Sequence, residues 1–379
     1  MIPFNKIHLT GKEIIYMQDV LNSGKIAGDG NYTKACEAFF EKQYSFKKAL
    51  LTASCTDALE LAAILIDIQP GDEVIMPSYG FVSIANAFVL RGAKIVFADS
   101  NTDNPNIDPK ETERLITPAT KAIVVIHYGG IACDILALKK IADKHKIYLI
   151  EDAAQAIDSF YNGLPLGSYG HLATFSFHET KNITCGEGGL LVINDKEFIT
   201  RSEIIREKGT NRSSFIRKEI AKYSWVDVGS SFLTSDISAA YLYAQLNHLD
   251  DIHKKRRAIW NNYYNSFKVL VQQQLIQLPF IPAGAVHNGH VFYILCKSLT
   301  ARTAYINYMH LNDVQTQFHY ITLHDSPFYK KKHGSRSLPM AAHYQDCLVR
   351  IPLFYDLEDN DINKIIELTC RFFISEFVN

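Results

Sequence analysis

The chain has 379 residues, a formal net charge of −1, 47% hydrophobic residues and 21% charged residues. This composition is typical of a globular protein with a sizeable core, and the length suggests two or three domains. The balanced charge argues against a nucleic-acid partner, and no apolar run reaches the roughly 18 residues that a membrane span needs.

The N-terminal sequence MIPFNKIHLT lacks the basic and then apolar layout of a signal peptide, so we expect a cytoplasmic protein. The seven cysteines are odd in number and include no CxxC pair. Reduced thiols are therefore expected, with no disulfide framework and no bound metal.

The first two thirds of the chain alternate short apolar segments with segments of helical spacing. TDALELAAILIDI predicts a helix over residues 56–68, with Gly71 as a stop signal. A second helix is predicted over residues 134–146. Buried strands are predicted over residues 73–78, 93–99, 121–128 and 146–154. This alternation implies a mostly parallel sheet with right-handed crossovers.

The pattern changes near residue 250. Residues 250–267 predict a long, charged amphipathic helix, and HVFYILC (290–296) and VQTQFHY (314–320) predict strands. We therefore expect a large α/β domain over residues 1–250 and a small α+β domain over residues 251–379. The sequence leaves open which of the two domains the N-terminal arm packs on.

Polar residues gather where predicted strands end, and open α/β sheets bind ligands at the carboxyl ends of their strands. The segment IYLIED puts Glu151 and Asp152 at such an end, and Gln155 follows. Asp152 has three interpretations: the cap of a following helix, a ligand of Mg²⁺, or the partner of a cationic ring nitrogen.

Two further segments follow predicted strands. LTASCTDALELAA puts Ser54, Cys55 and Thr56 at the start of a helix, where free N–H groups and the helix dipole bind anions. An ordinary N-cap by Ser54 or Thr56 explains the same pattern. In MPSYGFVS, Tyr79 and Phe81 either pack in the core or stack on a planar ligand.

The segment FSFHETKNITCGEGG, residues 175–189, places Lys181 in a polar turn before a glycine-rich loop. A phosphate cradle, an aromatic platform, a strand-end carboxylate and a loop lysine are the parts that a pyridoxal phosphate (PLP) enzyme needs. The lysine forms a Schiff base with PLP and later moves a proton. No GxGxxG follows a first strand and no GxxxxGK[ST] occurs, so nicotinamide and P-loop sites lose their main support.

With these motifs, the sequence resembles the DegT/StrS family of fold-type I PLP enzymes, the sugar-nucleotide aminotransferases, over essentially the whole chain. The segments that carry the resemblance are GDEVIMPSYGFVSIANAFVLRGAKIVFAD, EDAAQ, SFHETKN with GEGG, FHYITLH and IPLFYDL. SFHETKN, REKGTNR and GSSFLTSD are most similar to the dTDP-4-keto-6-deoxyglucose 4-aminotransferases of the WecE type. The implied fold is α/β, with a mostly parallel central sheet, helices on both faces and a smaller C-terminal α+β domain.

The resemblance also implies the roles of individual residues. Lys181 would carry the cofactor and the proton, and Asp152 would pair with the pyridinium nitrogen. Phe81 would stack on the ring, and Gln155 would lie beside its phenolic oxygen. The implied cofactor-binding set is Cys55, Thr56, Phe81, Asp152, Gln155, Ser176, Lys181 and Ser231.

The sequence departs from the family pattern at two places. In GSSFLTSD, Ser231 and Leu233 replace the Asn and Arg of a G-x-N-x-R motif, whose Asn reaches the phosphate of the neighbouring subunit. The nearby REKGTNR is either a solvated surface or supplies the missing charge through Lys208 or Arg212. The second departure is Gly80, for which only extra backbone freedom suggests itself.

The implied reaction moves an amino group from L-glutamate to a dTDP-keto-sugar, in a homodimer with shared active sites. The product would be an amino sugar for cell-surface polysaccharide, such as lipopolysaccharide O-antigen or enterobacterial common antigen. The 23–33 loop, His319, Tyr320 and His324 are candidate substrate contacts, although a buried or surface structural role is favoured for each histidine. Three alternatives remain: a C-3 aminotransferase, a PLP sugar dehydratase (those relatives carry His at the position of Lys181) and a non-catalytic regulator.

Overall fold

The computed structural model describes residues 1–333 and 336–375. A seven-stranded sheet runs through its centre. From one edge to the other, the strands are β1 (Lys48–Thr52), β9 (Gly189–Ile193), β8 (Leu172–Ser176), β5 (Tyr148–Asp152), β4 (Thr120–Ile126), β2 (Glu73–Pro77) and β3 (Lys94–Ala98). Every pair of neighbours is parallel except the two that include β9, which is antiparallel to both β1 and β8. The predicted mostly parallel sheet is confirmed.

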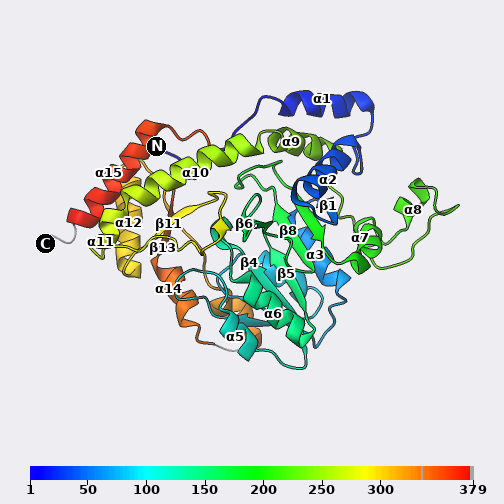
Figure 1. Cartoon of the computed structure of the whole chain (residues 1–379), viewed down its shortest axis with the longest axis horizontal. Helices are drawn as coiled ribbons and strands as arrows, with labels where there is room; N and C mark the ends of the chain where they lie inside the picture. The colour runs from blue at the N-terminus through cyan, green and yellow to red at the C-terminus, as the bar shows by residue number, and fades with distance from the viewer. Residues whose placement is uncertain (334–335, 376–379) are drawn as a thin grey trace.

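Helices cover both faces of this sheet (Figure 1). They are α2 (Asn31–Tyr44), α3 (Cys55–Leu65), α4 (Ser83–Val89), α5 (Pro109–Arg114), α6 (Ile135–His145), α7 (Ile199–Arg206) and α9 (Asp236–Leu246), whereas α8 (Arg212–Ile216) projects away from the sheet and buries none of its residues. Alternate residues of a strand point to opposite faces, so Val74 and Met76 join the core under α3 and α4, while Ile75 joins the core under α2, α6 and α9.

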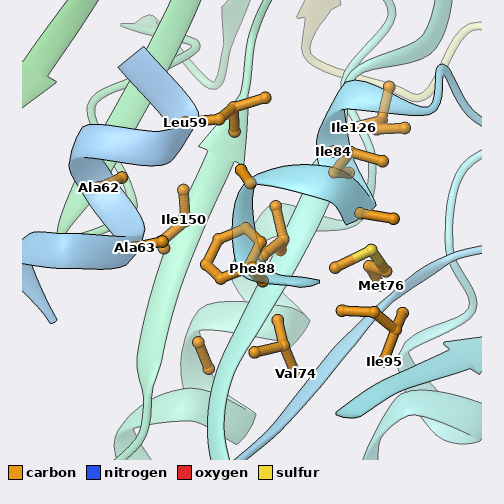
Figure 2. Close-up of a cluster of buried hydrophobic side chains, with 14 of the residues drawn as sticks. Leu59, Ala62, Ala63, Val74, Met76, Ile84, Phe88, Ile95, Ile126 and Ile150 are labelled. Atoms are coloured by element: carbon orange, nitrogen blue, oxygen red, sulfur yellow. The ribbon is translucent and has the colours of Figure 1, made fainter. Parts of the chain in front are cut away.

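Figure 2 shows part of the apolar core under α3 and α4. The labelled side chains are Leu59, Ala62 and Ala63 from α3, Val74 and Met76 from β2, Ile84 and Phe88 from α4, Ile95 from β3, Ile126 from β4 and Ile150 from β5. This packing fixes α3 and α4 against the sheet. It therefore also fixes the loops at the carboxyl ends of β1 and β2, from which the two helices begin.

A smaller antiparallel sheet follows, in the order β11 (Phe292–Leu295), β13 (Leu348–Ile351) and β12 (Gln317–Phe318). The helices of this region are α10 (Leu249–Ser266), α11 (Lys268–Gln272), α12 (Leu299–Leu311), α13 (Pro327–His333), α14 (Pro339–Cys347) and α15 (Asp359–Ser375). A core of its own joins residues 259–373 to Ile2. The division into residues 1–250 and 251–379 remains a prediction, and α10 runs unbroken across that boundary.

The strand predicted over residues 314–320 is shorter than expected, since only Gln317 and Phe318 pair with β13. His319 and Tyr320 leave the sheet and line a cavity instead. A third, three-stranded sheet joins β10 (Ala285–Val286), β6 (Phe160–Tyr161) and β7 (Leu164–Pro165).

The N-terminal arm packs on both regions of the chain. Ile2 pairs with Val314 beside the small sheet. Further along, α1 (Glu13–Ser23) lies against α9 (Figure 1). The arm therefore bridges the two regions, and residues 4–7 between these attachments line the cavity described below.

Candidate active site

A cavity of about 1080 Å³ opens where the carboxyl ends of the central strands face the small sheet. Seven of the eight residues predicted to bind the cofactor line it: Cys55, Thr56, Phe81, Asp152, Gln155, Ser176 and Lys181. The small sheet and its loops add His319, Tyr320 and Arg350, and the N-terminal arm adds Lys6. The cavity is thus built from segments that are far apart in the sequence.

The start of α3 offers two free backbone donors to this cavity. Ser54 is the N-cap, and its side chain accepts a hydrogen bond from the N–H of Asp57 at 3.0 Å. Within residues 1–333 and 336–375, the N–H groups of Cys55 and Thr56 have no acceptor. The Thr56 hydroxyl donates to that of Ser83 at 2.8 Å. The N-cap and the anion-site interpretations are therefore compatible. Ser54 caps the helix, and the next two N–H groups remain for an anion.

The glycine-rich loop allows a close approach to this helix start. A Cβ at Gly189 would lie 2.3 Å from the carbonyl carbon of Ser54, and one at Gly188 would lie 2.4 Å from the sulfur of Cys185. A side chain at Gly189 would push β9 away from the start of α3, and one at Gly188 would displace the side chain of Cys185. The glycines of GEGG therefore keep the phosphate cradle and the turn that carries Lys181 in one rigid unit.

Asp152 ends β5, is 9% exposed and faces the cavity. Its Oδ1 accepts a hydrogen bond from the N–H of Ala154 at 3.0 Å. No helix begins between residues 153 and 159, which form turns, so the helix-cap interpretation is wrong. Burial raises the pKa of the Asp152 carboxyl, while the charges of Lys181 and His127 act in the opposite direction. Such a carboxylate is suited to a cationic ring atom.

Lys181 lies in the turn after β8, where its N–H donates to the carbonyl of His178 at 2.9 Å. In the described part of the chain its Nζ has no hydrogen-bond partner. Burial lowers the pKa of this amine, and the nearby Cys55 and Asp152 raise it. A half-buried lysine without a salt bridge, in a cavity with a carboxylate, has the setting of a nucleophile or a base rather than of a surface residue.

Phe81 and Gln155 differ in how firmly the protein holds their side chains. The Phe81 side chain is 59% exposed on the cavity, so one face of its ring is open to a planar ligand. Gln155 is held: its Oε1 accepts from the N–H of Gly129 at 2.6 Å and its Nε2 donates to the hydroxyl of Tyr320 at 3.0 Å. The latter bond ties the loop after β5 to the small region.

Of the other aromatic and histidine candidates, some are buried away from the cavity and some line it. Tyr79 is fully buried among tyrosines and belongs to the core. His324 is buried and bonded to the hydroxyl of Ser78 at 2.7 Å, outside the cavity, so its role is structural. His319 lines the cavity, with Nδ1 3.0 Å from the hydroxyl of Tyr128. Residues 23–33 do not line the cavity of this chain.

Ser231 lies apart from the cavity of its own chain. It is exposed, and its backbone pairs with that of Glu207. The Arg212 guanidinium forms an ion pair with the Glu207 carboxylate, so its charge is already compensated. Lys208 is exposed and forms no ion pair in the described part of the chain.

The sequence analysis missed several polar cavity residues, among them Ser83, His290, Arg350 and Lys6. Ser83 lies in MPSYGFVS and His290 opens the predicted strand HVFYILC, but neither pattern marked these side chains as ligands. Burial and the charge of Lys181 lower the pKa of His290, whose Nδ1 lies 2.8 Å from Oδ1 of Asn182. Only the three-dimensional packing of β13, α4 and the arm brings these residues to the site.

The residues present fit PLP, because an open aromatic face, a buried carboxylate, and helix N–H groups and a lysine that have no partner among the described residues all face one cavity. Together with the sheet order, they define the class: a fold-type I, PLP-dependent aminotransferase. The family model of the DegT/DnrJ/EryC1/StrS aminotransferases matches residues 8–369, and the chain belongs to this family.

Individual relatives agree with this assignment. The spore coat polysaccharide biosynthesis protein SpsC of Bacillus subtilis is 33% identical over 97% of this chain and 95% of its own. The aminotransferase TlmJ of Streptoalloteichus hindustanus has a TM-score of 0.90 at 27% identity, over the whole of both chains. Spr1654 of Streptococcus pneumoniae, assigned as a sugar aminotransferase and solved in a PMP form, has a TM-score of 0.92 at 25% identity, over 99% of this chain and 100% of its own.

Proposed function

We propose that the protein transfers an amino group from L-glutamate to a keto-deoxy sugar nucleotide. The main observation in support is that Lys181 and Asp152 face one cavity. Its volume, about 1080 Å³, is at the upper end of the range for ligand-binding pockets. Such a cavity has room for a cofactor and a bulky second substrate. The descriptions of SpsC and Spr1654 support a sugar as the acceptor.

The proposed acceptor is dTDP-4-keto-6-deoxy-D-glucose, and the product a dTDP-4-amino-4,6-dideoxyhexose for cell-surface polysaccharide. SFHETKN, REKGTNR and GSSFLTSD support this narrower specificity by their resemblance to the WecE-type enzymes. Transfer at C-3 is the second candidate, since it needs only a different sugar pose.

The cytoplasm is the proposed compartment, and seven free cysteines are consistent with it. No described helix is long and apolar enough to cross a membrane.

When bound, PLP supplies an electron sink for the carbanion formed on the substrate. In the proposed mechanism, Nζ of Lys181 removes the proton from the α-carbon of glutamate, which leaves as its keto acid. In the second half of the reaction, the same amine delivers a proton to the sugar carbon that receives the nitrogen. Burial favours the neutral, proton-accepting form of this amine because it lowers the pKa.

The remaining residues would bind and orient. The N–H groups of Cys55 and Thr56 would hold the cofactor phosphate, the hydroxyl of Ser176 would support it, and Phe81 would cover one face of the ring. The carboxylate of Asp152 would keep a proton on the ring nitrogen, because a negative charge stabilises the protonated ring. Gln155 would contact the phenolic oxygen side. Each of these groups lines the cavity.

The test is incubation of the PLP-loaded enzyme with L-glutamate and dTDP-4-keto-6-deoxyglucose, followed by NMR of the product. The expected product carries its amine at C-4. An amine at C-3 would support the second candidate, and loss of a hydroxyl without gain of nitrogen would support a dehydratase. Absence of any turnover with either substrate would favour a non-catalytic regulator.

The proposed assembly is a homodimer in which Ser231 serves the cofactor of the partner subunit. Ser231 is exposed and lies outside its own cavity, and the preceding segment leaves large apolar side chains in solvent, with Trp225 80% exposed. Such a patch marks a contact surface. In a two-fold dimer, a segment given to one site is returned by the partner.

Mixing two inactive variants tests this sharing. One chain carries Lys181→Ala, and the other carries Ser231→Asp, whose negative charge would repel the cofactor phosphate. If Ser231 acts across the interface, the mixed dimer has one site with both lesions and one intact site, so activity returns in the hybrid fraction. If mixed dimers form without activity, Ser231 acts in its own subunit or not at all, and the sharing is refuted.

A further inference from the structure

Arg350 brings an uncompensated positive charge into the active-site cavity. It lies on β13, where it pairs with Tyr293 of β11 and Gln317 of β12, and it lines the same cavity as Lys181. Its charge is close enough to be among the causes that lower the pKa of Lys181 and of His319. The guanidinium therefore faces the reacting region and not the outer surface of the small sheet.

The protein itself offers the Arg350 guanidinium few and weak hydrogen-bond acceptors. Its Nη2 donates to Oε1 of Gln317 at 3.4 Å and to the carbonyl of Phe318 at 3.3 Å, both long for charged hydrogen bonds. The Phe4 ring of the N-terminal arm packs against it, with Cζ 4.7 Å from the ring centre. In the described chain, its buried Nε has no hydrogen-bond partner and no carboxylate lies within 4.0 Å.

Arg256, the other arginine of the cavity lining, shows the contrast. Its guanidinium donates to the carbonyls of Gly289, His290 and Leu353 at 2.7–3.1 Å. Burial lowers the pKa of Arg256 to about 9. Arg256 thus ties the 289–290 loop to Leu353 through short hydrogen bonds, whereas the only hydrogen bonds of the Arg350 guanidinium are two long ones.

We propose that Arg350 binds an anionic group of a substrate through its guanidinium. This inference rests on the proposed function, which offers two such groups: the carboxylate of the amino-acid donor and the diphosphate of the sugar nucleotide. Both present paired oxygens that match the planar fork of arginine. The Phe4 ring and the two weak bonds to β12 hold the guanidinium in place without competing with an oxyanion.

The experiment follows the two half-reactions separately, by the absorbance of the cofactor, in Arg350→Gln and Arg350→Lys. One arm mixes the PLP form with L-glutamate, and the other mixes the aminated form with dTDP-4-keto-6-deoxyglucose. Calorimetric titration with thymidine diphosphate measures nucleotide binding without turnover. A charged hydrogen bond contributes about 1.5–3 kcal/mol, so Arg350→Gln should raise the half-saturating concentration of one substrate about 10- to 100-fold.

The pattern of losses identifies the anion. If Arg350 binds the donor carboxylate, only the glutamate arm weakens and thymidine diphosphate binds as in the wild type. If it binds the phosphates, the sugar arm and thymidine diphosphate weaken together. Arg350→Lys keeps the positive charge but lacks the paired donors of the guanidinium, so we expect a smaller loss of affinity for the same substrate. If the Gln variant does not fold, the Lys variant decides between the two anions.

Arg302→Gln is the matched control. Arg302 also belongs to the small region, stacks on an aromatic ring (Cζ 5.3 Å from the centre of Phe318) and has a buried Nε without a partner in the described chain, but it lies outside the cavity. Both half-reactions should be unchanged in this control.

The proposal is overturned if Arg350→Gln leaves both half-saturating concentrations and thymidine diphosphate binding unchanged. It is equally overturned if only the saturating rates fall, because Arg350 would then act through the charge of Lys181. A wild-type enzyme that reacts with glutamate but not with the keto-sugar would contradict the proposed acceptor, and the glutamate arm would still test Arg350.

Discussion

Lys181→Ala is expected to abolish transamination and leave the fold intact. The amine is the proposed nucleophile and proton carrier, and loss of general acid–base catalysis alone costs roughly 10²- to 10⁴-fold in rate. The fold should survive because the side chain has no hydrogen-bond partner in the described chain and lies in a turn outside the apolar cores. Turnover, the visible absorbance of bound PLP and the melting temperature are the three measurements.

Lys196→Ala provides the control for this variant. Lys196 is an exposed lysine shortly after β9, outside the cavity. Its replacement should change neither turnover nor the cofactor absorbance. If Lys181→Ala transaminates at the wild-type rate, the assignment of Lys181 is wrong.

Asp152→Asn is expected to reduce activity and raise the stability of the cofactor-free protein. Removing the charge that faces the ring nitrogen should lower turnover by about 10²-fold or more, as for other preorganised electrostatic partners. Asparagine keeps an oxygen for the N–H of Ala154, so the local turn should be preserved. Cofactor binding should persist, since the phosphate site and Lys181 are unchanged.

The stability effect has a definite sign. Burial raises the pKa of Asp152 above its value in the unfolded chain, so the folded protein binds this proton more tightly. Ionisation of Asp152 therefore destabilises the native state once the pH rises through the folded pKa. Without cofactor, Asp152→Asn should melt above the wild type at neutral pH, and this difference should close as the pH falls below both pKa values.

Asp134→Asn is the matched control, because Asp134 is a helix cap. Its side chain accepts from the N–H of Ala137 at the start of α6. Asparagine caps helices about as well as aspartate, so little change in stability or activity is expected there. If Asp152→Asn behaves like this control in both measurements, the charge of Asp152 has no special role.

The repeating apolar pattern made the central sheet predictable. Its strands are buried on both faces and therefore appear as short continuous apolar runs, each followed by a turn or a helix start. Because parallel strands end at one edge, the polar residues after these strands could be grouped into one site before any coordinates were known. The cavity contains Ser54, Cys55, Thr56, Asp152 and Gln155, whereas Glu151 is buried away from it.

What the sequence could not show depends on tertiary contacts. Arg350 lies in an apolar strand motif, and only the pairing of β13 with β12 turns its side chain toward Lys181. The shortness of β12 follows from the departure of His319 and Tyr320 into the cavity. No local pattern indicates that Arg350 faces the cavity, whereas FHYITLH made His319 and Tyr320 candidate contacts without showing that they leave the strand.

Gly80 is a third position whose role depends on tertiary contacts. We expected backbone freedom to explain it, yet its φ is not positive. A Cβ there would lie 2.5 Å from Cδ1 of Ile126, so the requirement is space beside β4. Such a close approach arises from the packing of the bend after β2 on a side chain of β4 and leaves no trace in the local sequence.

Borohydride reduction of the PLP-loaded protein, followed by peptide mass spectrometry, tests the central claim most directly. Reduction fixes the cofactor to the lysine that carries it. The account predicts the added mass on the peptide that contains Lys181 and on no other peptide. Added mass on a different lysine, such as Lys6 in the same cavity, or a protein that binds PLP without any fixed adduct, would contradict the account.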